Sequence, residues 1–228
     1  MLIFQLSDVW SKTYPDSHAG VLVVRDAQNP ARHALLEKRR EALEEELRAR
    51  YSGQDRTSLL NNPVLQAYDA YYRRFKKTYH VQLQLESILF KGKSIPAVAA
   101  LVEAMFMAEL DHLLLTAGHD LDSLRTPLTL EVATGAEHYT LLRGELQAPK
   151  AGDMMILDNE GIISSIIYGP DQRTQITEKT RHAVFTVYGP AGIRAEDIRL
   201  QLEEILDNVR VIAPEARVEM LEVFGGNS

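Results

Sequence analysis

The stretch DMMILDNEGIISSIIYGPDQRTQIT, residues 153–177, holds two apolar runs separated by the turn residues Asp-Asn-Glu-Gly. Apolar runs of this length between such breaks predict β-strands. The same pattern recurs on both sides of the stretch, in LTLEVA, HYTLL and HAVFTVYG. We therefore expect an antiparallel β-sheet or barrel to occupy the chain from Arg125 onward.

The residues before Arg125 follow the period of α-helices instead. Two Asn-Pro pairs, at Asn29 and Asn62, each offer a helix N-cap with proline in the first turn. Further helices are expected over residues 81–90, from Ser94 onward, and over residues 195–209. The fold class is α+β, a helical N-terminal half followed by an antiparallel sheet or barrel with flanking helices.

The chain divides by its sequence pattern into two parts. We expect residues 1–61 to form two short strands, Leu2–Leu6 and Val21–Arg25, and a charged helix that packs on the main domain. The segment YPDSHAG between these strands predicts a loop. Residues 62–228 are expected to form the main domain, closed by a C-terminal helix and strand.

The chain has 228 residues, a net charge of -7 and no cysteine. The charge argues against a general nucleic-acid binder, because such binding neutralises phosphates with Lys and Arg. Without cysteine there is no disulfide and no cysteine-held zinc, and no run approaches the about 18 apolar residues of a membrane helix. The N-terminus lacks a signal-peptide pattern. We expect a soluble, cytoplasmic protein with no cofactor, no metal and no membrane partner.

The one basic cluster consists of Arg73, Arg74, Lys76 and Lys77, at the end of a helix with a stripe of tyrosines. Cations at a helix C-terminus complement the helix dipole, and aromatic residues at this spacing usually pack inward. The alternative is a patch that contacts phosphates, with tyrosines that stack on unpaired bases. Any contact with a nucleic acid is therefore expected to be local.

In the segment TAGHDLDSL, residues 116–124, an imidazole and two carboxylates lie close together at His119, Asp120 and Asp122. Such groups can hold a divalent metal, provided that His80 or His112 joins them. The alternative is a loop in which Asp120 caps the following turn by accepting backbone N–H groups.

Hydrogen-bonding side chains follow the Gly-Pro break at residues 169–170. The guanidinium of Arg173 can clamp a carboxylate or phosphate, and the hydroxyl of Thr174 can orient a substrate or a water. Alternatively, Asp171 and Arg173 pair with each other across a tight turn. The residues leave both interpretations open.

Four motifs follow one another between Tyr68 and Gly189: a glutamate-containing helix before KGKSIP, then DLDSL, LDNEG and DQRTQITEKT. In this order they resemble the editing domain of the phenylalanyl-tRNA synthetase beta subunit, and more closely the stand-alone relatives of that domain. The resemblance implies a barrel-like sheet with a pocket. In the synthetase this pocket removes tyrosine wrongly attached to the tRNA for phenylalanine, by hydrolysis of the aminoacyl ester.

The resemblance also implies how the pocket works. It positions a water and uses the terminal ribose hydroxyl of the substrate, so that no strong general base is required of the protein. The residues that it places around the substrate are Asp120, Gly169, Arg173, Thr174 and Thr186. The basic cluster at residues 73–77 would meet the tRNA backbone.

Two departures from the family pattern affect specificity and catalysis. Thr186 stands where the synthetase has a glutamate that recognises the tyrosine hydroxyl, so a different amino acid is expected. His119 is adjacent to Asp120 rather than a few residues before it, so no catalytic histidine is transferred. The leading hypothesis is hydrolysis of a mischarged aminoacyl-tRNA. The alternatives are a non-catalytic module that binds tRNA or an amino acid, and a metal-dependent hydrolase.

Overall fold

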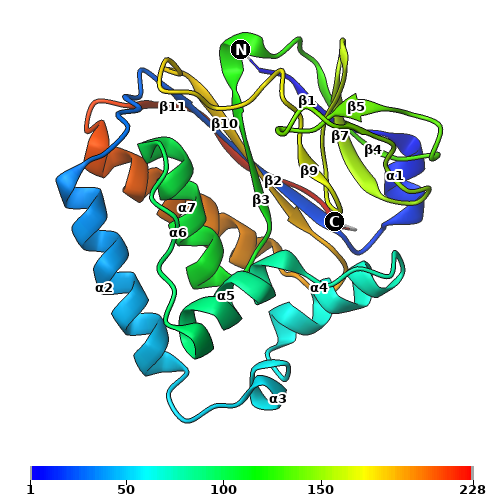
Figure 1. The fold of residues 1–228 in the computed structure, drawn as a ribbon. Helices are drawn as coiled ribbons and strands as arrows, with labels where there is room; N and C mark the ends of the chain where they lie inside the picture. Colours follow the sequence, from blue (N-terminus) through cyan, green and yellow to red (C-terminus); the bar gives the residue numbers. More distant parts are fainter. Residues whose placement is uncertain (1, 227–228) are drawn as a thin grey trace.

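The computed structural model describes residues 2–226, which form a mixed α+β fold (Figure 1). The helices are α1 (Asp8–Thr13), α2 (Ala34–Arg50), α3 (Arg56–Leu59), α4 (Pro63–Arg73), α5 (His80–Lys91), α6 (Ala100–His112), the short 3-10 helix η1 (Leu121–Ser123) and α7 (Ala195–Ile212). The strands are β1 (Phe4–Leu6), β2 (His18–Arg25), β3 (Thr116–Asp120), β4 (Leu128–Val132), β5 (Tyr139–Thr140), β6 (Leu146–Gln147), β7 (Met154–Asp158), β8 (Gly161–Ser165), β9 (Gly169–Pro170), β10 (Ala183–Gly189) and β11 (Arg217–Gly225). The predicted α+β class is confirmed.

The strands form two main sheets and a small hairpin. A five-stranded sheet has the order β1-β4-β7-β8-β9, with β1 parallel to β4 and the other pairs antiparallel. A four-stranded antiparallel sheet has the order β11-β2-β10-β3, and β5 pairs with β6 alone. Across residues 2–226 these sheets form no closed barrel, so the sheet alternative of the prediction is the correct one.

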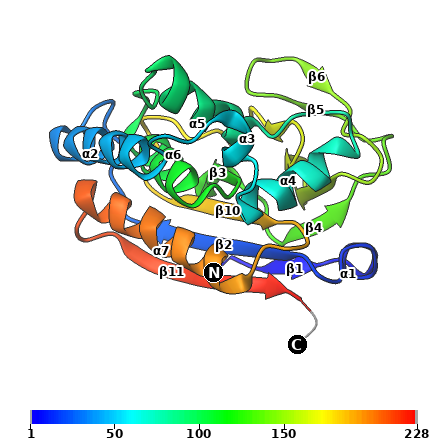
Figure 2. The same cartoon turned by 90° about the horizontal axis from the view of Figure 1, so that it is seen from below.

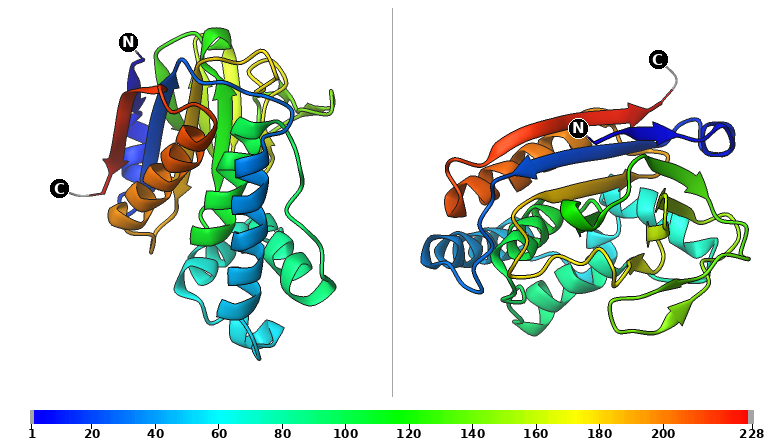
Figure 3. Two further views of the ribbon diagram at one scale, coloured as in Figure 1. Left: turned by 90° about the vertical axis from the view of Figure 1, so that its left-hand side faces the viewer. Right: turned by 90° about the horizontal axis from the view of Figure 1, so that it is seen from above.

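Helices cover one face of the four-stranded sheet, and the five-stranded sheet covers the other. Figures 2 and 3 show α7 along β2 and β11, with α6 beside it and α2 farther out. Gly20 on β2 permits the close approach of α7, because a Cβ there would lie 2.3 Å from Ile198. Between the sheets, the hydroxyls of Ser164 and Tyr188 are 2.5 Å apart. β3 is the last strand of its sheet, so its other edge is free.

Only one of the two Asn-Pro pairs starts a helix. Asn62 caps α4 as predicted, since its side chain accepts from the N–H groups of Val64 and Leu65. The predicted helix start at Asn29 is wrong, because α2 begins only at residue 34. The Asn29 amide instead accepts from the backbone of Leu101 at 2.8 Å and donates to that of Thr177 at 2.7 Å. Tertiary hydrogen bonds have replaced the local cap.

Two other boundaries also shift. The expected loop YPDSHAG is wrong at its end, where residues 18–20 pair with β10 and β11 as part of β2. The helix expected from Ser94 begins only at Ala100. The strands β1 and β2 join partners from beyond residue 61, and the proposed division at that residue stays a prediction. No helix among the described residues is long and apolar enough to cross a membrane.

The tyrosines of α4 tie this helix to the ends of strands. The hydroxyl of Tyr68 donates to the carbonyl of Tyr188 at the end of β10 and accepts from the N–H of Leu115, just before β3, at 2.9 Å. The hydroxyl of Tyr72 donates to the carbonyl of Ile166, just after β8, at 2.9 Å. Both rings are buried, so they pack inward and are not free to stack on bases.

Candidate functional site

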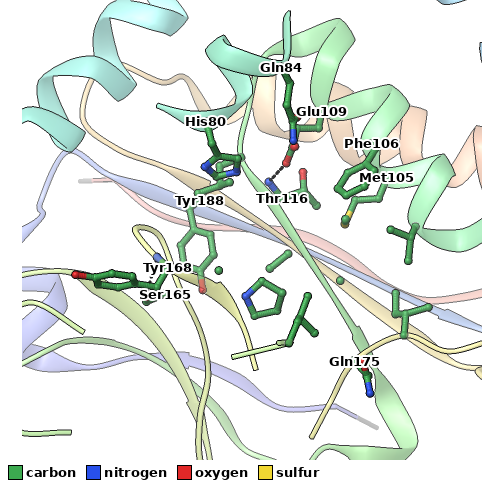
Figure 4. Close-up of a pocket in the computed structure, with 18 of the residues that line it drawn as sticks. His80, Gln84, Met105, Phe106, Glu109, Thr116, Ser165, Tyr168, Gln175 and Tyr188 are labelled. Atoms are coloured by element: carbon green, nitrogen blue, oxygen red, sulfur yellow. Dashed lines mark hydrogen bonds between the residues drawn. The ribbon is translucent and has the colours of Figure 1, made fainter. Parts of the chain in front are cut away.

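A cavity of about 480 Å³ lies along the free edge of β3. Figure 4 shows its lining, which comes from β3, α5, α6, the end of β10 and the segment after β8. We call it the β3-edge cavity. Its lining includes the side chains of His80, Gln84, Val102, Met105, Phe106, Glu109, Tyr168, Gln175, Ile176 and Tyr188.

His80 begins α5 and borders the cavity with a defined tautomer. Its Nδ1 atom lies 3.1 Å from the hydroxyl of Tyr72, whose single proton is donated to the carbonyl of Ile166. The Nδ1 atom must therefore carry a proton and donate it to Tyr72, which leaves a lone pair on Nε2. Burial lowers the pKa of His80 to about 4, so the imidazole is neutral at physiological pH.

Glu109, on α6, adds a second titratable group to the same end of the cavity. Burial raises its pKa to about 8, against the opposing effect of a 2.8 Å hydrogen bond from the N–H of Thr116. At pH 7 the carboxyl is therefore mostly protonated and can donate a hydrogen bond. Gln84 lies one turn after His80 on α5 and also lines the cavity. Together His80, Gln84 and Glu109 form the polar end of the cavity.

The walls beyond the polar end are largely apolar. Val102, Met105 and Phe106 from α6 line them together with Ile176. The hydroxyl of Tyr188 is already engaged by Ser164. Apolar walls with a few convergent polar groups are typical of small-molecule sites. The cavity therefore suits a ligand with an apolar body and one polar end.

Of the five residues predicted around the substrate, Gly169 lines the β3-edge cavity. Asp120 caps η1, with one carboxylate oxygen accepting from the N–H of Asp122 at 2.9 Å and the other from the hydroxyl of Thr180 at 2.6 Å. A substrate contact for Asp120 stays a prediction. The capping interpretation is confirmed, although residues 116–120 are a strand rather than a loop.

Arg173 lies in a different environment. Its Nη2 atom is 2.8 Å from the carboxylate of Asp158, and its Nη1 atom donates to the carbonyl of Ser123 at 2.8 Å. The predicted partner Asp171 is also present, at 3.7 Å. Arg173 borders a separate cavity of about 330 Å³ together with Asp171 and His138. A substrate contact for this guanidinium stays a prediction.

Thr174 and Thr186 are buried in the protein interior. The hydroxyl of Thr174 donates to the carboxylate of Asp171 and lies 2.8 Å from Nδ1 of His119. Burial lowers the pKa of His119 to about 3. The hydroxyl of Thr186 points to the carbonyl of Ala117 at 3.4 Å. Neither threonine lines the β3-edge cavity, and their substrate roles stay predictions.

The residues considered for a metal do not gather in one place. Within residues 2–226, the group with the spacing of a metal site is Asp111, His112 and Glu204. The imidazole of His112 lies 2.7 Å from the Glu204 carboxylate, and Asp111 pairs with Arg50. These contacts link α6 to α7 through His112 and Glu204, and α6 to α2 through Asp111 and Arg50.

The basic cluster at the end of α4 is exposed. Arg73 pairs with Asp69 at 2.8 Å. The Arg74 guanidinium lies 5.3 to 5.5 Å from the centres of three aromatic rings, so it has a packing role. Lys77 lies 5.6 Å from the ring centre of Tyr168, which lines the β3-edge cavity. The cluster therefore extends to the side of the cavity.

Sequence reasoning missed most of the polar end. Gln84 has no sequence signature, and the sequence indicates for His80 only a role as a metal ligand. Glu109 offered a signal, because it interrupts the most apolar helix of the chain. A carboxylate in such a helix is expected to be buried with a perturbed pKa, which is typical of functional sites.

Comparisons with known proteins identify the family and the fold of the chain. The model of the B3/4 domain family matches residues 65–208, more than half of the chain. Among solved structures, the chain is similar to an N-terminal fragment of the phenylalanyl-tRNA synthetase beta-subunit from Pyrococcus horikoshii, with a TM-score of 0.50 and 11% identity. That match covers 95% of this chain and 50% of the other, so the chain spans about half the length of the fragment. No curated protein sequence matches. The resemblance found in the sequence is confirmed, and the chain belongs to the B3/4 domain family.

Proposed function

We propose that this protein hydrolyses the ester of a mischarged aminoacyl-tRNA in the β3-edge cavity. The observation that carries the proposal is the cavity itself, with a neutral histidine, an amide and a protonated carboxyl at one end and apolar walls beyond. An aminoacyl ester matches this cavity, because its acyl group is polar and its side chain can lie along the apolar walls. Membership of the B3/4 family and the fold shared with a phenylalanyl-tRNA synthetase beta-subunit fragment support this class of substrate.

The polar end has groups suited to ester hydrolysis. Nε2 of His80 accepts a hydrogen bond from the attacking water, while Gln84 and protonated Glu109 donate to the carbonyl oxygen as negative charge develops on it. The water oxygen bonds to the acyl carbon, the bond from this carbon to the ribose oxygen breaks, and the ribose oxygen takes up a proton. The products are the free amino acid and the tRNA.

The exposed basic cluster supports a tRNA partner. Arg73, Lys76 and Lys77 lie at the end of α4, and Lys77 is near Tyr168 at the cavity wall. Cations placed there would meet phosphates of the acceptor end while its aminoacyl group enters the cavity. This arrangement fits local contact by a chain whose net charge is -7.

The test is deacylation of a panel of tRNAs, each charged with a wrong amino acid with an apolar side chain. We expect the protein to release the amino acid from at least one member well above the spontaneous rate. His80→Ala should slow this release about 100-fold, within the range for groups that act directly on a reacting water. If no member of the panel is hydrolysed, the proposal is wrong.

A second candidate is a module that binds aminoacyl-tRNA or an amino acid without hydrolysis. The low pKa of His80, about 4, favours it because such an imidazole is a weak base. Binding of panel members by filter retention, with no release of the amino acid over hours, would support this candidate. Release by the wild type but not by His80→Ala would exclude it.

A further inference from the structure

The free edge of β3 has a defined pattern of backbone groups. On the paired edge, the N–H of Tyr188 donates to the carbonyl of Leu115 at 3.1 Å, and the N–H of Leu121 donates to that of His182 at 2.9 Å. In an antiparallel ladder, the backbone N–H and C=O groups of successive residues point alternately to the two edges of the strand. The backbone groups of the odd-numbered residues from 115 to 121 therefore point toward β10. The backbone groups of the even-numbered residues therefore point away from β10, toward the β3-edge cavity.

One of these outward residues has no backbone hydrogen-bond partner on this edge within residues 2–226. The N–H of Thr116 donates to Glu109 at 2.8 Å, and the N–H of Asp120 donates to the carbonyl of Thr174 at 2.7 Å. Between them, Gly118 lines the cavity, and within residues 2–226 neither its N–H nor its carbonyl has a hydrogen-bond partner on this edge. An unpaired donor and acceptor on a sheet edge are a template for one more residue of strand.

We propose that Gly118 binds the backbone of the substrate's amino acid as a one-residue antiparallel bridge. Its N–H donates to the acyl carbonyl of the ligand, and its own carbonyl accepts from the α-amino group. An α-amino acid is the smallest ligand with both groups, because a hydrogen-bonded antiparallel pair uses the N–H and C=O of one residue on each side. The inference rests on the proposed function and names how the aminoacyl group is held.

The direction of β3 orients this ligand. The N–H of Gly118 points out nearer Thr116, and its carbonyl points out nearer Asp120. The acyl carbonyl therefore lies toward His80 and Glu109 at the polar end, and the α-amino group lies toward Gln175 at the other end. Figure 4 shows Thr116 and Glu109 at one end of β3 and Gln175 at the other. The bridge thus brings the scissile carbonyl to the groups proposed to act on it.

The bridge also fixes the face on which the ligand's side chain lies. Opposed residues of an antiparallel pair place their side chains on the same face of the sheet. A Cβ on Gly118 would lie 2.9 Å from Ile176 and 3.1 Å from Met105. The side chain of an L-amino acid therefore lies on the face with these apolar groups, next to Phe106. We expect the cavity to prefer L-amino acids with apolar side chains.

The test uses calorimetric binding of methyl esters of L-leucine, L-methionine and L-phenylalanine to the full chain. Gly118→Pro removes the N–H donor, and the matched control Gly118→Ala keeps it. Proline is tolerated on a strand whose N–H points off the sheet edge. For the tightest ester, the proline variant should bind about tenfold more weakly than the alanine variant. Equal binding by the two variants would overturn the bridge.

A second series changes the ligand and keeps the wild-type chain, so it holds even if the proline variant fails to fold. The D-ester, and the ester lacking the α-amino group, should each bind at least tenfold more weakly than the L-ester. Equal affinity for either, or no binding of any L-ester, would overturn the bridge. Deacylation of the tRNA panel is measured separately. Release of the amino acid from tRNA, without a preference for the L-ester, would support the proposed function and overturn the bridge. A preference for the L-ester, without release from tRNA, would support the bridge and overturn the proposed function.

Discussion

The Nδ1 atom of His80 lies 3.1 Å from the hydroxyl of Tyr72, and this contact fixes which nitrogen of the imidazole faces the cavity as an acceptor. The hydroxyl is held in turn by the carbonyl of Ile166, to which it donates. A tyrosine on α4 thus sets the tautomer of a histidine on α5. The same tyrosine ties both helices to the segment that follows β8.

Loss of this hydroxyl should impair hydrolysis more than folding. Tyr72→Phe removes the acceptor for Nδ1–H, so the other tautomer becomes accessible and Nε2 no longer reliably accepts from water. We expect deacylation to slow about tenfold, for the loss of one hydrogen bond. The matched control is Tyr79→Phe, which removes a buried hydroxyl bonded to Leu113. Equal rates for the two variants would refute the role of Tyr72.

Glu109 should make stability fall as pH rises. Its pKa is about 8 in the folded protein against an ordinary value of 4.5. Between these values the unfolded chain has released the proton and the folded chain still binds it, so the free energy of unfolding decreases with pH. Relative to Glu109→Gln, the wild type should lose up to about 1.4 kcal/mol per pH unit from pH 5 to pH 8.

Urea unfolding at several pH values measures this difference. The control is Glu145→Gln, which neutralises an exposed glutamate and should show a much flatter difference from the wild type over the same range. A constant offset between the wild type and Glu109→Gln would show that the carboxyl is not held protonated by burial.

The exposed lysines of the basic cluster should set the salt dependence of tRNA binding. Changing Lys76 and Lys77 together to Gln removes two phosphate contacts, so the slope of log affinity against log salt should become shallower by about 1.5. Arg74 is left unchanged because it packs on aromatic rings. The control is the pair Lys38→Gln and Arg199→Gln, on α2 and α7. If the control changes the slope as much as the test pair, the assignment is wrong.

Arg173 should matter for stability more than for ligand binding. Its guanidinium pairs with Asp158, whose side chain is fully buried. Arg173→Ala leaves that carboxylate without its cation, and we expect a loss of about 2 kcal/mol in the free energy of unfolding. Arg217→Ala, which breaks an exposed pair with Asp26, should cost about 0.5 kcal/mol. Loss of ester binding by Arg173→Ala without loss of stability would instead favour its predicted substrate role.

The sequence was sufficient for the fold class and for elements with strong local signals. Asn62 with Pro63 predicted the start of α4, and the helix expected over residues 81–90 matches α5, which spans His80–Lys91. Asn29 carried the same local signal as Asn62 and failed, because its amide bonds to α6 and to the loop at Thr177. A cap motif does not reveal a competing tertiary partner.

The candidate site was harder to predict for a similar reason. Its key contacts join residues far apart in the sequence, such as Tyr72, which orients His80, with Ile166 just after β8. The backbone of Gly118 has no sequence signature, because its importance depends on β3 being the last strand of its sheet. The polar run at residues 171–177 indicates a ligand contact by its composition. Yet Arg173 mainly pairs with Asp158, and Asp171 mainly accepts from Thr174.

The most direct test of the account is the deacylation rate of a variant in which the β3-edge cavity is filled. Val102 is half-buried on α6 and lines the cavity, whereas Val211 is half-buried on α7 and does not. On the tRNA that the wild type deacylates fastest, Val102→Trp should lose at least 90% of the activity. This tenfold loss corresponds to a rise of about 1.4 kcal/mol in the activation free energy. Val211→Trp should retain the activity. Full activity in a folded Val102→Trp protein would contradict the claim that the ester is hydrolysed in this cavity.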